Sequence, residues 1–314
     1  MKNSPHRRLN KDIITGGSME FINELGAKKT EIEAIVEKYL PKEEGYQKTI
    51  FSAMNYSVEA GGKRLRPMLM QETYQMFGGT NEAILHPFMA AIEMIHTYSL
   101  VHDDLPAMDD DEYRRGRKTT HIVYGEAMGI LAGDALLNYA FETASESFED
   151  PLSLAFTTKA FRVLAKKAGV YGMVGGQVVD VENDGKPIDE GQLDFINRLK
   201  TSALIEASMM IGAILAGADE AAVNDVEQIA RHVGLAFQIQ DDILDVISTT
   251  EELGKPVHSD EKNNKTTYVT LFGIEQAKEK VEEFTKISLT LLKKYTTEDT
   301  FLYKLLAYLV DRKY

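Results

Sequence analysis

The chain has 314 residues, of which 44% are hydrophobic and 27% charged, so it contains enough apolar residues for a sizeable core. Its formal net charge of −14 argues against nucleic acid as the main partner, because binding to phosphate backbones needs a basic face. The absence of cysteine excludes disulfides and thiolate metal sites and fits the reducing cytoplasm, where we expect the protein to act. No run of about 18 apolar residues occurs, so we expect no integral membrane segment.

The amino terminus differs in character from the rest of the chain. Residues 1–17 are basic, polar and rich in turn formers, they lack an apolar signal core, and a helical pattern begins only at Met19. We therefore expect residues 1–18 to be an N-terminal extension, whether a tag, a mis-called start or a disordered arm, and residues 19–314 to form the folded domain.

Helical spacing of apolar residues dominates the remainder. The pattern predicts helices over 20–40, 47–60, 67–77, 86–104, 126–148, 152–167, 171–182, 190–216, 221–247, 266–294 and 298–311. The polar breaks at 105–119, 183–189 and 248–265 contain Gly, Pro or both, and none is a low-complexity linker. No run of alternating, β-branched residues predicts a strand, so we expect a single all-α domain.

The first acidic cluster directly follows the apolar helix predicted over 86–104. It holds five aspartates within residues 103–111, and three arginines and one lysine follow at 114–118. Most acidic runs are solvated loops, but dense acid beside dense base is typical of metal ions that bridge protein to phosphate. Asp103 and Asp109 would not share a helical face. Because Pro106 cannot continue an unperturbed helix, we expect a bend that brings both carboxylates to one site.

The second acidic cluster lies inside the apolar run 233–247. Asp241 and Asp245 are four residues apart and share a helical face, with Asp242 beside them. Like charges at that spacing destabilise a bare helix. A hard cation with oxygen ligands would relieve this repulsion, so the pattern indicates a second metal-binding element at a helix end.

Basic and polar residues accompany the two clusters. The turn at 61–67 opens with two glycines and contains three cations, which suits either diphosphate capture or an ordinary helix cap with surface charges. His96 lies on the helix that precedes the first aspartates, where a lone histidine is more often structural. Lys200, Thr201 and Gln238 fall among apolar neighbours, where an unpaired lysine would be costly.

As an ordered set, these motifs resemble those of trans-isoprenyl diphosphate synthases, and they are most similar to those of bacterial farnesyl diphosphate synthases. The resemblance covers residues 20–314 and rests on GGKRLRP (61–67), HDDLPAMDDDEYRRGR (102–117), GGQVVD (175–180), KT (200–201), FQIQDDILD (237–245) and LGKPVHSD (253–260). It implies the all-α isoprenoid-synthase fold, a single helical bundle around a deep central cavity, and a homodimer. The implied substrates are isopentenyl diphosphate and an allylic diphosphate, either dimethylallyl or geranyl.

In the implied reaction the allylic diphosphate ionises with loss of pyrophosphate, isopentenyl diphosphate attacks the cation, and a proton leaves. The implied cofactor is Mg²⁺, with three ions per active site. The implied catalytic residues are Asp103, Asp104, Asp109, Lys200, Thr201, Gln238, Asp241, Asp242 and Asp245. Among them Asp103, Asp109 and Asp241 would bind metal.

The same resemblance divides the basic residues between the two substrates. Lys63, Arg66, His96 and Arg115 would hold isopentenyl diphosphate, while Arg114, Lys200 and Lys255 would hold the allylic diphosphate with Lys265 nearby. Thr201 and Gln238 would turn their oxygens towards the developing cation. The loop 248–265 contains Gly254, Lys255 and Pro256 and could close as a lid over substrate.

Product length is implied by Tyr98 and its neighbour Ser99. Tyr98 lies five residues before Asp103, more than one helical turn deeper in the expected cavity. An aromatic residue here resembles the floor that stops bacterial farnesyl synthases at fifteen carbons, although Tyr98 could also be simply a core residue.

Several alternatives remain open at this point. A geranylgeranyl or geranyl diphosphate synthase would share all of these motifs except the one that limits chain length. His102–Asp103 resembles the start of a His-Asp metal phosphohydrolase site, but the seven histidines lack the spacing that such a site needs. A non-catalytic subunit would tend to lose aspartates that are present here, and a terpene cyclase would carry a different second metal motif.

Overall fold

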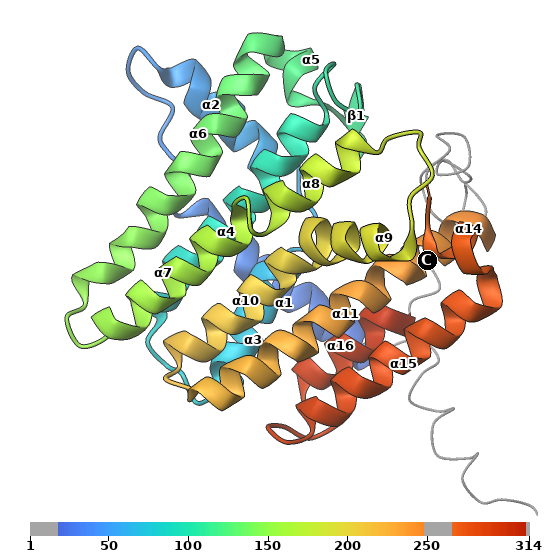
Figure 1. Ribbon diagram of the computed structural model, residues 1–314. Helices are drawn as coiled ribbons and strands as arrows, with labels where there is room; N and C mark the ends of the chain where they lie inside the picture. Colours follow the sequence, from blue (N-terminus) through green and yellow to red (C-terminus); the bar gives the residue numbers. More distant parts are fainter. Residues whose placement is uncertain (1–17, 248–265, 312–314) are drawn as a thin grey trace, which may run out of the picture. The chain divides into compact units, whose positions relative to one another are not determined.

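A computed structural model describes residues 18–247 and 266–311 (Figure 1). Helices dominate these residues, as expected. Their bounds are α1 Met19–Glu37, α2 Lys48–Val58, α3 Leu65–Met76, α4 Glu82–Asp103, α5 Thr120–Tyr124, α6 Glu126–Ser145, α7 Leu154–Ala168, α8 Met173–Glu182, α9 Glu190–Ile196, α10 Ala203–Leu215, α11 Glu220–Ile247, α14 Tyr268–Phe272, α15 Ile274–Leu292 and α16 Phe301–Asp311. A 3₁₀ turn covers Glu146–Glu149, a π-helical turn covers Asn197–Ser202, and a two-stranded hairpin pairs β1 Tyr113–Arg114 with β2 Arg117–Lys118.

The chain forms two compact units. The α4 unit consists of residues 27–168 and 207–223, and the α11 unit consists of residues 1–26, 169–206 and 224–314. Each is described below by itself. That residues 19–314 act as one domain stays a prediction. The expected lid, residues 248–265, lies outside the described residues, and so does the expected extension up to residue 17.

The α4 unit is built around its longest apolar helix. Asn81 caps α4 by accepting a hydrogen bond from the backbone N–H of Ala83 at 3.1 Å, and the middle of the helix is fully buried. Helix α6 packs against α4, α2 and α5. Small residues on α6 allow this close approach, since a Cβ at Gly133 would collide with the ring of His102. The unit therefore holds the carboxyl end of α4, where the first aspartates lie, in a fixed setting.

The α11 unit has its own core along α11, α15 and α16. Buried residues recur at three- and four-residue intervals on α11, namely Val226, Ile229, Val233, Ala236, Ile239 and Ile243. Phe21 packs its ring against those of Phe301 and Tyr308, with centroids 5.4 and 5.5 Å apart. Asp225 accepts hydrogen bonds from Tyr295 at 2.7 Å and from Lys294 at 3.0 Å, which fastens α11 to the end of α15.

Beyond small shifts of helix ends, the observed elements differ from the predicted ones at four places. The region predicted as one helix over 190–216 is interrupted by the π-helical turn at 197–202, and the one predicted over 266–294 breaks at Gly273, where φ is +80°. Helix α5 and the hairpin β1–β2 were not predicted, because both are too short to show periodicity. None of the helices within 18–247 and 266–311 has the length and apolar character needed to cross a bilayer.

Candidate active site

The first acidic cluster lies where α4 ends and the chain folds back on itself. The backbone N–H of Asp109 donates to the carbonyl of Asp103 at 2.9 Å, and that of Met108 donates to Leu105 at 2.8 Å. The bend predicted around Pro106 is therefore confirmed, and it places Asp103 and Asp109 next to each other in space although they are six residues apart. Asp103 is half-buried, while Asp109 is exposed.

This turn fits a magnesium site of the open kind. Among the described residues, no group of three or more His, Cys, Asp or Glu side chains is arranged to hold a metal ion. Mg²⁺ usually keeps several waters and binds one or two carboxylates together with substrate phosphates, so a complete protein cage is not required. Asp103 and Asp109 can supply these carboxylates.

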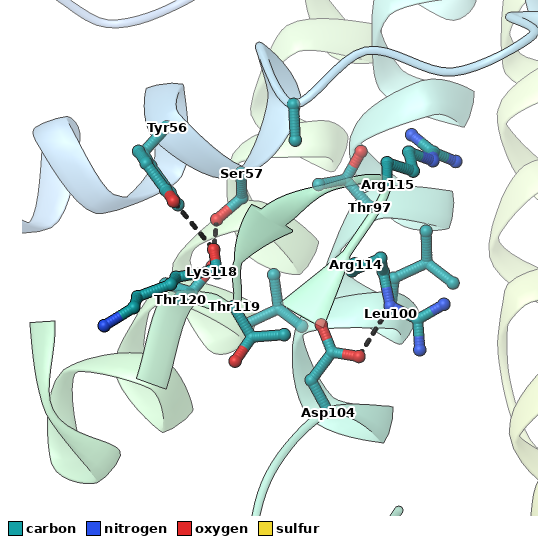
Figure 2. A pocket seen from close by; sticks show the side chains of 12 residues that line it. Tyr56, Ser57, Thr97, Leu100, Asp104, Arg114, Arg115, Lys118, Thr119 and Thr120 are labelled. Carbon is teal, nitrogen blue, oxygen red and sulfur yellow. Dashed lines mark hydrogen bonds and ion pairs between the residues drawn. The ribbon is translucent and has the colours of Figure 1, made fainter. Parts of the chain in front are cut away.

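Asp104 has a different environment from its neighbours. It is 4% exposed, and its carboxylate accepts a hydrogen bond from Nε of Arg114 at 2.5 Å (Figure 2). Burial raises the pKa of Asp104 to about 6, although the ion pair with Arg114 lowers it. The hydrogen bond to Asp104 therefore holds the Arg114 side chain in place.

The hairpin β1–β2 presents two arginines beside this acidic turn. Arg115 and Gly116 form its two-residue loop, and both have positive φ, at 54° and 76°, as a type I′ turn requires. Nη1 of Arg115 donates to the carbonyl of Gly61. The guanidinium lies so close to Gly62 that a Cβ there would meet it at 2.5 Å, so the glycine is needed for this approach.

A small pocket lies between the hairpin, α2 and α4 (Figure 2). Tyr56 donates to the carbonyl of Lys118 at 2.7 Å, and the hydroxyls of Ser57 and Thr120 are 2.8 Å apart. These bonds fasten the hairpin to the end of α2. The pocket is lined by Tyr56, Ser57, Ala60, Thr97, Leu100, Val101, Asp104, Arg114, Arg115, Lys118, Thr119 and Thr120.

Cations crowd together next to the pocket. Desolvation is the main cause that lowers the pKa of Arg66 to about 10; Glu93 opposes this shift, and the charge of Arg115 adds to it. Desolvation likewise holds the pKa of His96 well below its usual value, and the nearby arginines, led by Arg66, push it in the same direction. Lys63 is exposed on the same turn. In a chain with a net charge of −14, this excess of positive charge indicates a site for an anion.

Arg64 and Glu93 were not singled out from the sequence. Both are buried, and Nη1 of Arg64 lies 2.7 Å from Oε1 of Glu93. The available signal was the glutamate itself, because an acid in the middle of the apolar helix 86–104 needs a buried partner.

Backbone strain is concentrated in the same unit. Within the described part of the chain, three non-glycine residues have positive φ: Arg64, Asp110 and Arg115. All three belong to the basic turn, the acidic turn or the hairpin loop just described. Such conformations are costly for side chains other than glycine and cluster at functional sites.

In the α11 unit, Lys200 lies in the π-helical turn and forms an ion pair with Asp180 of α8 at 2.5 Å. The close packing of Gly176 makes this geometry possible, because a Cβ at that position would collide with the backbone of Leu199 and Lys200. Single π-helical turns of this kind are frequent at functional sites.

A chain of hydrogen bonds joins the π-helical turn to α11. Thr201 donates to Gln238 at 3.1 Å, Gln238 donates to Asp242 at 3.0 Å, and the carboxylate of Asp242 accepts from the backbone N–H of Tyr268 at 3.4 Å. Asp242 is thus held in place from two sides, and it fixes the amide of Gln238.

The second acidic cluster occupies the last two turns of α11, which ends at Ile247, so it lies near a helix end as predicted. Asp245 is buried at 3% exposure, whereas Asp241 is half-buried and therefore accessible. Lys255 and Lys265, the two predicted phosphate ligands of the next loop, lie outside the described residues.

Tyr98 and Ser99, the two residues predicted to limit product length, both lie on α4. Tyr98 is 6% exposed, its ring meets that of His102 edge-on at 5.8 Å, and burial raises its pKa to about 12. Ser99 donates its hydroxyl to the carbonyl of His96 at 2.9 Å. His102 contacts the carbonyl of Ile130 at 3.0 Å and belongs to the packing of α4 on α6.

Comparisons with known proteins agree with these features. The chain is 46% identical over 262 residues to a farnesyl diphosphate synthase of Geobacillus stearothermophilus, covering 83% of this chain and 86% of that protein. It is 44% identical over 267 residues to a geranylgeranyl diphosphate synthase of Cyanophora paradoxa, covering 84% of this chain and 87% of that protein.

A solved structure of an FPP/GFPP synthase from Zymomonas mobilis has a TM-score of 0.80 at 31% identity, covering 93% of this chain and 99% of that chain. This agreement confirms the predicted isoprenoid-synthase fold. The family description "Polyprenyl synthetase" matches residues 47–305. A match of this length, together with relatives of this identity, shows that the chain belongs to the polyprenyl synthetase family.

Proposed function

We propose that this prenyltransferase makes farnesyl diphosphate by condensing isopentenyl diphosphate with dimethylallyl or geranyl diphosphate. The observation that carries the proposal is the crowding of Arg66, His96 and Arg115 beside the turn that bears Asp103 and Asp109. An anion with two phosphates suits such a cluster, and the relatives named as farnesyl diphosphate synthases support this choice of product.

Isopentenyl diphosphate is the substrate that we assign to the cluster in the α4 unit. Lys63 offers a mobile point charge, while Arg66 and Arg115 offer planar guanidinium groups that match phosphate oxygens. Because the pKa of His96 is low, its ring would be neutral and would donate one N–H···O hydrogen bond to the diphosphate. Binding of the diphosphate would offset the mutual repulsion of these groups.

The allylic diphosphate is assigned to Arg114, Lys200 and Lys255, with Lys265 beside them. Asp103, Asp109 and Asp241 would hold Mg²⁺, three ions per active site. When bound, Mg²⁺ would supply positive charge that stabilises the departing pyrophosphate. Asp104 would hold Arg114, and Asp242 would hold Gln238, as their hydrogen bonds indicate.

The remaining residues act on the allylic carbon chain. Thr201 and Gln238 are fixed by their mutual hydrogen bond, so their oxygens can face the developing positive charge with little reorganisation. Apolar helix walls keep water from quenching the cation. The final proton leaves the carbon chain, and no protein nucleophile is needed.

A primer assay tests the assignment. Purified full-length chain is incubated with Mg²⁺, isopentenyl diphosphate and either dimethylallyl, geranyl or farnesyl diphosphate, and the products are separated by chromatography. We expect the first two primers to yield a fifteen-carbon diphosphate and the third to be a poor substrate. Absence of condensation with every primer would refute the proposed function.

Geranylgeranyl diphosphate synthesis is the second candidate, favoured by the relative from Cyanophora paradoxa. In that case farnesyl diphosphate would serve as an efficient primer and the main product would have twenty carbons. The third arm of the primer assay therefore separates the two candidates.

Tyr98 decides the product length in this proposal. Its buried ring would block chain growth beyond fifteen carbons, so we expect Tyr98→Ala to shift the main product to twenty carbons or more. Tyr98→Phe keeps the ring and serves as the control, with a product distribution like that of the unchanged protein. Chromatography of dephosphorylated products measures the shift, and an unaltered fifteen-carbon product from Tyr98→Ala would contradict the floor role.

We further propose that the protein forms a homodimer and acts in the cytoplasm. The surface of α5 and α6 carries large apolar side chains that are 39–53% exposed, namely Ile122, Val123, Ile130 and Leu131. Large exposed apolar side chains on neighbouring helices would suit an interface between two copies.

A further inference from the structure

Arg64 lies between Lys63 and Arg66 in the basic turn, but its side chain has a different environment from theirs. Lys63 is exposed and Arg66 half-buried, whereas the Arg64 side chain is 4% exposed. Three cations that look equivalent in the sequence therefore divide into two that can reach a ligand and one that cannot.

The buried guanidinium of Arg64 connects three helices of the α4 unit. Nη1 donates to Glu93 in the middle of α4 at 2.7 Å, and Nη2 donates to the carbonyl of Val58, the last residue of α2, at 2.6 Å. Nε lies 3.6 Å from Glu33 of α1. Arg64 thus fixes the point at which α3 begins relative to its neighbours.

The backbone at this point is strained. Arg64 has a φ of +50° at the N-cap of α3, a conformation that costs an arginine more than it costs a glycine. The side-chain contacts hold Arg64 in this conformation. The conformation in turn fixes the positions of Lys63, just before α3, and of Arg66, in its first turn.

Glu93 serves more than one of the cations. It is 2% exposed, it pairs with Arg64, and its charge raises the pKa of both Arg66 and Arg115. A single buried carboxylate therefore balances part of the positive charge that the anion site accumulates.

We propose that Arg64 and Glu93 form a positioning pair, which holds the turn bearing Lys63 and Arg66 in the geometry that binds the diphosphate of isopentenyl diphosphate but does not touch it. This inference rests on the proposed function. It assigns to Arg64 a role different from that of the two cations beside it.

Steady-state kinetics on the full chain test the pair. We expect Arg64→Met to raise the KM for isopentenyl diphosphate by about 10- to 100-fold, since small displacements of binding groups have effects of that size. The KM for geranyl diphosphate should stay within about twofold. Arg64→Lys keeps the charge but cannot make both hydrogen bonds, so its KM should fall between those of Arg64→Met and the unchanged protein.

A double variant separates positioning from direct contact. Glu93→Gln should raise the same KM, and combining it with Arg64→Met should raise it no further, because the two residues act as one unit. Calorimetry should rank the dissociation constants of these variants for inorganic pyrophosphate in the same order as their KM values for isopentenyl diphosphate. Lys29→Met is the control: it removes an exposed cation 3.7 Å from the same Glu33 and should change neither KM.

Three results would overturn the inference while leaving the proposed function intact: an unchanged KM in Arg64→Met, an equal rise in both KM values, or effects of Arg64→Met and Glu93→Gln that multiply. If Arg64→Met does not fold, Arg64→Lys is judged by the same criteria. Absence of condensation by the unchanged protein would instead refute the proposed function.

Discussion

Asp103→Asn and Asp241→Asn are each expected to lower kcat for the condensation by about 10²- to 10³-fold, the loss typical of removing one group that stabilises transition-state charge. The amide keeps the size of the side chain but loses the negative charge that a hard cation needs. The KM for isopentenyl diphosphate should change little, because its assigned ligands are cationic side chains. Initial rates with geranyl diphosphate over a range of Mg²⁺ concentrations measure both quantities.

Asp184→Asn is the matched control, because Asp184 is exposed in the turn that follows α8 and lies in neither cluster. Its kcat should equal that of the unchanged protein. A rate near that of the unchanged protein in Asp103→Asn or Asp241→Asn, at limiting Mg²⁺, would refute the metal-binding roles and the mechanism built on them.

The features that could be predicted from the sequence are those that depend on local chemistry. Pro106 cannot continue a helix, and this alone predicted the bend that returns Asp109 to Asp103. The three- and four-residue spacing on α11 likewise predicted both its length and the shared face of Asp241 and Asp245. Local periodicity was therefore enough for the long helices and for the placement of the acidic residues on them.

The features that were missed depend on contacts between distant segments. The π-helical turn around Lys200 accompanies close packing of Gly176 against its backbone and of Gly234 against Ser202, none of which is visible in local periodicity. The direction of Arg64 depends on Glu93, 29 residues further along the chain. The pairing of Asp104 with Arg114 depends on a hairpin with strands of two residues each, too short to predict.

The buried pair Arg64–Glu93 should also have a large effect on stability. Removing one member leaves the other charge buried, which typically costs about 3–5 kcal/mol of unfolding free energy, a drop in Tm of roughly 10 °C. Glu93→Leu should be the more harmful change, because it leaves Arg64, Arg66 and Arg115 close together without their shared carboxylate. Arg64→Met leaves Glu93 with two cations nearby and should cost less.

Combining the two changes tests this charge argument. The double variant Arg64→Met/Glu93→Leu should be more stable than Glu93→Leu alone, since it removes one of the repelling cations and fills the space with apolar groups. As a control, the exposed pair Glu275–Lys278, with side chains 85% and 48% exposed, should contribute at most about 1 kcal/mol. Thermal unfolding followed by circular dichroism measures all of these variants. If Glu93→Leu and Arg64→Met were equally harmful, and the double variant lost the sum of both, each residue would stabilise the fold independently and Glu93 would not be the shared counter-charge of the three arginines.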